Sequence, residues 1–148
     1  DWEQRKLENI VEVCSGRDYK HLEAGNIPVY GTGGYMLSVS EALSYDVDAI
    51  GIGRKGTINN PIFVEEHFWN VDTAFGLKAN DAILDKYLYY FCLSFDFSKL
   101  DKSTAMPSLT KTSIGNVLIP IPPYKEQERI VAKIDMVLDT MNEILRAV

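Results

Sequence analysis

The feature that most constrains this sequence is an uninterrupted helical pattern at its C-terminal end, in residues 124–148. This stretch contains neither Gly nor Pro, and its apolar residues recur at alternating steps of four and three, the heptad spacing of helices that pair. A helix of that length runs roughly 37 Å. The seam consists of Ile130, Ile134, Val137, Met141, Ile144 and Val148, and it is flanked by Val131, Leu138 and Leu145.

The apolar stripe of this helix is three positions wide in every seven, which is wider than a two-stranded coiled-coil seam requires. A small domain does not easily cover a stripe of that length, so the pattern favours a second helix against part of it. Packing of the whole helix on its own domain is the alternative. We expect the six seam residues to form a helix interface.

A proline-rich segment separates this helix from the rest of the chain. Pro120, Pro122 and Pro123 fix the backbone in an extended form, because proline restricts φ and disfavours a helix in the residue before it. The sequence therefore predicts a first domain in residues 1–122 and a spacer or dimerisation helix in residues 123–148. The expected fold class is α+β, with a compact, mixed, strand-rich domain followed by the long helix.

Within residues 1–122, short runs rich in β-branched or aromatic residues alternate with turn residues, as strands do. The expected strands are Ile10–Val13, Ile27–Tyr30, Ala49–Ile52, Ile62–Val64 and Asn116–Ile119.

Two segments of the first domain have helical spacing. Residues 39–43 form a weak pattern, and residues 81–95 form a stronger one, with Asp81 or Asn80 as the expected N-cap. The apolar face of the stronger pattern is formed by Leu84, Tyr87, Leu88, Phe91 and Phe95.

The scarcity of Cys and His argues against a metal centre or a disulfide framework. Cys14 and Cys92 are far apart in the sequence and there are only two His residues, so we expect free thiols in a reducing cytoplasm. The carboxylate pairs, at 46/48 and 65/66, have no convincing catalytic partner. No apolar run approaches the roughly 20 residues of a membrane span, and no signal peptide is evident. We therefore expect no catalytic site, metal, cofactor or membrane contact.

The formal net charge of −6 argues against a nucleic-acid binder that works by bulk positive charge, but it leaves room for a local basic face. One glycine-rich loop, Gly51–Gly56, matches the G-x-G-x-x-G pattern and carries Arg54 and Lys55. A dinucleotide site needs a helix directly after that pattern, whereas Asn59-Asn60-Pro61 is turn chemistry. The loop instead places two cations on a glycine-rich turn, where Arg54 suits a phosphate or a guanine edge.

Two further loops have a similar chemistry. The segment Tyr30–Tyr35 combines glycines, a hydroxyl and aromatic rings, with Arg17, Lys20 and His21 upstream. The segment Ser98–Ser113 combines three lysines with seven hydroxyl residues, which suit phosphates and base edges. Each loop taken alone is also explained as an ordinary turn. The candidate DNA-contacting residues are Thr32, Gly33, Gly34, Tyr35, Arg54, Lys55, Lys102, Ser103, Thr104, Ser108, Thr110 and Lys111.

The order of these segments resembles a known family. The resemblance is carried by the following stretches: Trp2–Ile10, Cys14–Gly16, Ile27–Gly34, Ile52–Gly56, Phe68–Phe75, Met106–Leu109, Ile119–Pro123 and Glu126–Val131. Together they are similar to one target recognition domain and one conserved helix of the specificity (S, or HsdS) subunit of type I restriction–modification systems. The match extends over nearly the whole chain.

The resemblance implies a non-catalytic module that recognises one half of a split target in double-stranded DNA. It implies modification (methyltransferase) subunits and a restriction (endonuclease) subunit as partners that supply the chemistry. Family members pair two such helices antiparallel, so a second recognition domain is expected, either in cis or from a homodimer. The competing hypotheses are a nucleotide-binding enzyme domain built on Gly51–Gly56 and a protein-interaction domain that docks only through its C-terminal helix.

Overall fold

The computed structural model describes residues 2–43, 49–53, 58–100 and 109–148. Nine strands, three α-helices and two 3₁₀ turns lie in these ranges. In chain order they are β1 (Glu3–Lys6), η1 (Leu7–Asn9), β2 (Val11–Ser15), β3 (Ala24–Gly31), β4 (Gly34–Val39), β5 (Ala49–Gly53), β6 (Ile62–Val64), β7 (Trp69–Asn70), β8 (Ala74–Ala79), α1 (Asp85–Ser94), η2 (Phe97–Leu100), α2 (Lys111–Gly115), β9 (Leu118–Ile121) and α3 (Tyr124–Ala147).

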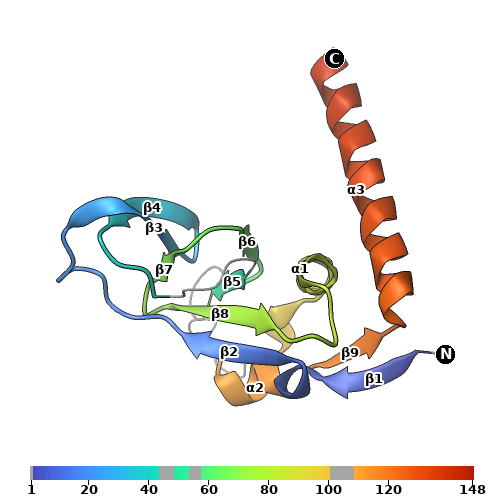
Figure 1. The fold of residues 1–148 in the computed structure, drawn as a ribbon, viewed down its shortest axis with the longest axis horizontal. Helices are drawn as coiled ribbons and strands as arrows, with labels where there is room; N and C mark the ends of the chain where they lie inside the picture. Colours follow the sequence, from blue (N-terminus) through green and yellow to red (C-terminus); the bar gives the residue numbers. More distant parts are fainter. Residues whose placement is uncertain (1, 44–48, 54–57, 101–108) are drawn as a thin grey trace.

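The strands form three small sheets. The central sheet has the order β2-β8-β5-β6 and is antiparallel throughout. A second sheet, β4-β3-β7, lies at the end of the molecule away from α3 (Figure 1). The third is the two-stranded ribbon β1-β9, which pairs the start of the chain with the segment just before α3. The expected strand-rich domain with a long C-terminal helix is confirmed.

The proline-rich segment is extended, as its composition predicts. Pro120 lies in β9 opposite Gln4 of β1, and Pro123 precedes the first residue of α3. Proline is tolerated here because a two-stranded ribbon leaves one side of each strand unpaired. The ribbon therefore fixes the point from which α3 leaves the domain.

The main core lies between the central sheet, α1 and α2. Its fully buried members come from distant parts of the sequence and include Leu7, Ile10, Leu77, Leu88, Phe97, Ile114 and Ile119. Burial of this apolar surface is the dominant favourable term in folding, so it holds both ends of the first domain together. A smaller cluster around Val29, Val39 and Trp69 supports the β4-β3-β7 sheet.

Close approach of two chain segments requires glycine at one position. A Cβ on Gly16 would lie 1.8 Å from the carbonyl oxygen of Val71, where no side chain fits. This contact brings the end of β2 against the segment between β7 and β8. It couples the central sheet to the β4-β3-β7 sheet.

The strand predictions agree with the structure except at their ends. Residues 62–64 form β6 with the predicted bounds, and Ala49–Ile52 lies within β5. Ile27–Tyr30 lies within β3, and β2 begins at Val11 instead of Ile10. The strand predicted over Asn116–Ile119 begins only at Leu118, because Asn116 caps the C-terminal end of α2.

The helix predicted over residues 39–43 is wrong. Val39 is the last residue of β4 and pairs with Ile27, and residues 40–43 are irregular. Val39 is buried in the small cluster, so sheet pairing and burial override the weak helical spacing.

The stronger helix prediction is confirmed over a shorter range. Helix α1 begins at Asp85, and the residue at its N-cap position is Leu84, which has no side chain able to cap it. Asn80 accepts a hydrogen bond from the backbone of Ala82 (2.9 Å) and so forms a turn before the helix. The predicted cap at Asn80 or Asp81 is therefore wrong. The Leu84 N–H donates instead to the side chain of Gln127 in α3, at 2.8 Å.

Candidate nucleic-acid interface

The turn between β3 and β4 has an open backbone. Gly34 has φ of 119°, a conformation that favours glycine, and a Cβ on Gly33 would meet nothing within 4 Å. Backbone groups at this turn can therefore approach a ligand closely. The turn and residues 71–73 line a shallow groove of about 460 Å³ together with Tyr19.

Aromatic and apolar side chains stand beside this turn. Tyr35 is 60% exposed, its hydroxyl is 2.8 Å from the Ser38 hydroxyl, and its ring meets the edge of Tyr30. Burial, and then the charge of Glu66, raise the pKa of Tyr30 above its ordinary value, so its hydroxyl stays protonated at neutral pH. Met36 is also exposed next to Tyr35. The turn thus presents rings, a thioether and open backbone on one surface.

The loop that follows β2 is fixed next to this sheet. The Arg17 N–H donates to the carbonyl of Asn70 (2.9 Å), and the Trp69 indole N–H donates to the carbonyl of Arg17 (2.9 Å). His21 meets the edge of the Trp69 ring. These contacts leave Arg17, Lys20 and His21 exposed beside β7. We call the turn 31–36, the loop 16–23 and the residues 71–73 the hairpin surface.

Not all candidate residues belong to the hairpin surface. Thr110 caps α2: its hydroxyl accepts from the Ser113 N–H, and the Ser113 hydroxyl accepts from the Thr110 N–H, both at 3.0 Å. Lys111 is exposed at the start of α2, near Glu8 and Val13. In Figure 1, α2 lies below β2, whereas β3 and β4 lie above β8. The structure therefore does not bring Lys111 to the hairpin.

Six of the candidate residues lie outside the described residues: Arg54, Lys55, Lys102, Ser103, Thr104 and Ser108. The strand before the first pair is described. Gly53 ends β5 and pairs with Ala74, the residue that follows the groove-lining Thr73. Strand β5 thus ends at the hairpin surface.

The antiparallel pairing of β5 is unlike that of a dinucleotide-binding unit. That unit needs a parallel strand reached through a helix, whereas β5 pairs antiparallel with β6 and with β8. Residues 58–61 are irregular and strand β6 follows at Ile62.

The seam residues of α3 divide into two groups. Ile130 packs against the main core and Ile134 is half-buried, so the domain covers the first part of the seam. Val137, Met141, Ile144 and Val148 are exposed, as are the flanking Leu138 and Leu145. The free part of the helix projects away from the domain (Figure 1).

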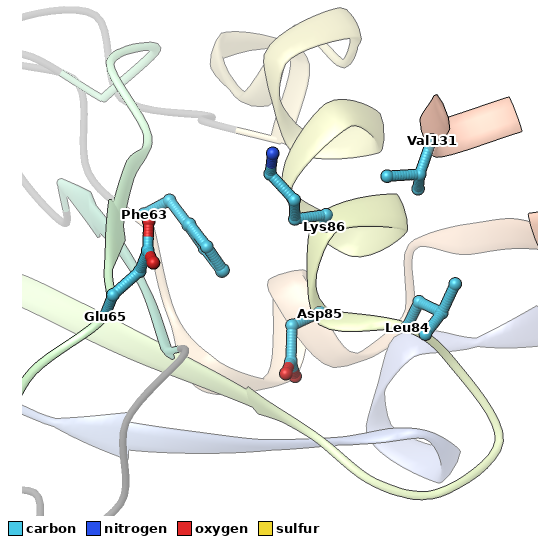
Figure 2. Close-up of a pocket in the computed structure, with 6 residues that line it drawn as sticks. All are labelled: Phe63, Glu65, Leu84, Asp85, Lys86 and Val131. Atoms are coloured by element: carbon cyan, nitrogen blue, oxygen red, sulfur yellow. The ribbon is translucent and has the colours of Figure 1, made fainter. Parts of the chain in front are cut away.

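The base of α3 borders a groove that Figure 2 shows in close-up. Its lining comes from the end of β6, the start of α1 and the first half of α3, and consists of Phe63, Glu65, Leu84, Asp85, Lys86 and Val131. Lys86 Nζ lies 3.0 Å from Asp135, and the Tyr90 hydroxyl donates to the same carboxylate. The Tyr90 hydroxyl, followed by the Lys86 ammonium, holds the pKa of Asp135 below its ordinary value.

The sequence-based list missed several residues of the hairpin surface. Tyr19, Met36 and Asp72 line the groove. The pairing of β3 with β4 and β7 brings Met36 and Asp72 together, and the hydrogen bond from the Arg17 N–H to Asn70 holds the loop of Tyr19 beside them. Their sequence neighbours give no sign of this pairing, because β7 has only two residues. Within the described residues, no helix is both long and apolar enough to cross a membrane.

Comparison with solved structures places the fold in one class of protein. The chain is similar to a chain of a structure that concerns complex assembly and conformational transition of the type I R-M system (TM-score 0.81, 19% identity, 99% of this chain and 40% of that one). It is also similar to the HsdS subunit of Thermoanaerobacter tengcongensis (TM-score 0.78, 19% identity, 99% and 39%). A third similar structure is the type I restriction-modification S subunit of M. genitalium (TM-score 0.74, 25% identity, 98% and 42%).

These matches show the fold of type I specificity subunits, and the chain spans about two fifths of the length of each. The model of the type I restriction modification DNA specificity domain family matches residues 1–148. The chain therefore belongs to that family. A search of curated proteins gave no match.

Proposed function

We propose that this chain recognises one half of a split target in double-stranded DNA and directs the methylation and cleavage that partner subunits of a type I restriction–modification complex perform. The observation that carries this proposal is the match of a DNA specificity family over all 148 residues. The chain itself is non-catalytic in this proposal. The methyltransferase and endonuclease subunits supply the chemistry.

The proposed division of labour follows the fold. Residues 1–122 contact DNA and residues 123–148 pair with a second helix. The exposed apolar residues of α3 support the pairing, since Leu145 is 68% exposed and Met141 is 53% exposed. The second helix comes from a recognition domain in cis or from a second copy of this chain.

The hairpin surface is the proposed centre of DNA contact. Its open glycine turn permits close approach to a nucleic-acid backbone, and Arg17 and Lys20 supply positive charge beside it. Arg54 and Lys55 follow Gly53 in the sequence, and Gly53 pairs with Ala74 at the edge of this surface. Thr110, Lys111 and the residues 102–108 form a second proposed contact region on the chain.

The test is DNA binding in the presence of the methyltransferase subunits, with duplexes selected from a random library. Gly33→Ala adds a methyl group into open space, so we expect unchanged stability but weaker DNA binding. If Arg54 contacts a base, Arg54→Ala weakens binding by about 1–3 kcal/mol and relaxes the choice of base there.

A matched pair of lysine variants tests the second region. Lys111→Ala is expected to weaken binding to all DNA sequences alike. It is also expected to reduce the slope of the logarithm of the binding constant against the logarithm of salt concentration by about one. Lys133→Ala removes the same charge from the exposed side of α3 and is expected to change neither. Binding that is absent with the methyltransferase present, or that does not depend on salt, would contradict the proposal.

A further inference from the structure

Among the residues that the structure describes, it is the first half of α3 that packs against the recognition domain. Ile130 and Val131 pack against the main core, and Gln127 and Asp135 bond to residues around α1. Every residue from Met136 to Val148 is exposed. The direction of the projecting half is therefore set by the contacts below it.

Gln127 makes a polar attachment at the base of the helix. Its side chain is 1% exposed, and its amide accepts from the Leu84 N–H (2.8 Å) and donates to the carbonyls of Ala82 (3.2 Å) and Pro122 (3.0 Å). One amide thus joins the turn before α1, the proline-rich segment and α3. Because all three partners are backbone groups, the amide fixes the position of the helix base.

Asp135 makes a second attachment, about 12 Å further along the helix. Lys86 and Tyr90, four residues apart on one face of α1, both donate to its carboxylate. Two attachments separated along an axis define its direction, whereas one attachment leaves a pivot. We call Gln127, Asp135, Lys86 and Tyr90 the α3 clamp.

Because the free part of α3 is long, a small displacement at the α3 clamp becomes a larger displacement at the end of the helix. A sideways shift of about 1 Å at Asp135, with Gln127 as the pivot, moves Val148 by about 2.6 Å, because an α-helix rises 1.5 Å per residue. Successive bases along a DNA strand are separated by about 3.4 Å. Loosening the clamp in both of two paired chains moves the helix ends by about 5 Å in total, which is comparable with a change of about one to two base pairs in the separation of the half-sites.

We infer that Gln127 and Asp135 are positioning residues that fix the direction of α3 on the recognition domain and so determine how strictly the protein selects the distance between its two half-sites. The inference on distance rests on the proposed function. The inference on direction does not, because it concerns the free protein.

The first experiment measures the direction of α3 without DNA. Spin labels are attached at Glu23→Cys and Glu143→Cys in a Cys14→Ser background, diluted with unlabelled protein, and their separation is measured by pulsed electron paramagnetic resonance. Both label sites are exposed. Asp135→Ala is expected to widen the distance distribution by about 2 Å, because residue 143 lies twice as far from Gln127 along the helix as Asp135 does.

Two further variants make this result specific. Lys86→Met combined with Tyr90→Phe removes both donors from the other side of the clamp and is expected to widen the distribution equally. Asp139→Ala makes the same chemical change one turn later on an exposed position and is expected to leave it narrow. Thermal unfolding curves, recorded under the same conditions for every variant, confirm that each variant is folded.

The second experiment measures the selected distance. Duplexes carry two copies of the half-site selected by the parent chain, with the separation varied in single base pairs. The parent is expected to prefer duplexes with one separation. Asp135→Ala is expected to bind duplexes whose separation differs by one base pair nearly as well, with unchanged affinity for an isolated half-site. A merely destabilising variant would instead lower affinity at all separations.

The outcomes are distinguishable. A distance distribution as narrow in Asp135→Ala as in Asp139→Ala overturns the inference and leaves DNA recognition untouched. If the spin-label distance distribution widens but the preference among half-site separations does not change, the role in spacing is overturned. If the parent chain binds no DNA while the distribution widens, the proposed function fails and the role in spacing falls with it.

Discussion

Replacement of Gln127 by Leu tests whether α3 is held on the domain by hydrogen bonds or by packing volume alone. Leucine is apolar and of comparable size, but it offers nothing to the Leu84 N–H or to the carbonyls of Ala82 and Pro122. A buried donor left unpaired costs about 1–3 kcal/mol, and each of two lost bonds to carbonyls costs about 0.5–1.5 kcal/mol, offset by about 1 kcal/mol of extra apolar burial. We expect a loss of about 1–5 kcal/mol in the free energy of unfolding.

Urea unfolding followed by far-UV circular dichroism measures this loss, and an unchanged slope with denaturant shows that the folded state keeps its compactness. Gln127→Glu is the matched variant, because a protonated carboxyl retains one donor and one acceptor. Burial raises the folded-state pKa of a carboxyl at this site, so its stabilising contribution is present below the unfolded value of about 4.3 and is lost as pH rises. Relative to the parent at each pH, we expect Gln127→Glu to recover stability between pH 7 and pH 4.

Two results would refute this reasoning. The first is a Gln127→Leu chain whose stability lies within about 0.5 kcal/mol of the parent, as for an ordinary surface substitution. The second is a Gln127→Glu chain whose difference from the parent does not change with pH. Either result would mean that the amide is dispensable and that apolar packing of Ile130 and Val131 alone holds the helix.

Three other predictions follow from described contacts. Met141→Glu places a charge on the exposed seam, so sedimentation velocity is expected to show weaker assembly while urea unfolding of the single chain is unchanged. The hydrogen bond from Tyr90 lowers the pKa of Asp135. The stability that this carboxylate contributes is therefore present at neutral pH and lost as pH falls. The difference in free energy of unfolding between the parent and Asp135→Ala should shrink from pH 7 to pH 3. Burial raises the pKa of Cys92 to about 12, whereas partial desolvation raises the pKa of the exposed Cys14 less. A thiol reagent should therefore label only Cys14 in the folded chain, faster as pH rises, and both cysteines in urea.

The assembly prediction has a clear negative outcome. Parent and Met141→Glu chains that sediment alike in the presence of a second recognition domain would show that the exposed seam does not pair. The thiol prediction fails if the folded chain reacts at both cysteines at equal rates.

The sequence alone determined those features that depend on neighbouring residues. The heptad spacing of residues 124–148 and the absence of helix breakers there are sufficient for α3, which extends over Tyr124–Ala147. Alternating short apolar runs and turn residues identified β3, β5 and β6. The order of such segments, more than any single motif, pointed to the family that the comparisons show.

Only the tertiary structure decided the features that depend on distant partners. Helix α1 begins at Asp85 because the Leu84 N–H bonds to a glutamine in α3, and residues 39–43 are not helical because Val39 pairs with Ile27. The candidate loops are similar in composition, yet the turn at Gly33 and the lysine at 111 lie on different parts of the fold. The division of the α3 seam into a covered first part and a longer exposed part is likewise invisible in a uniform heptad. A sequence pattern records which face of an element is apolar, whereas what covers that face depends on the packing of segments far apart in the chain.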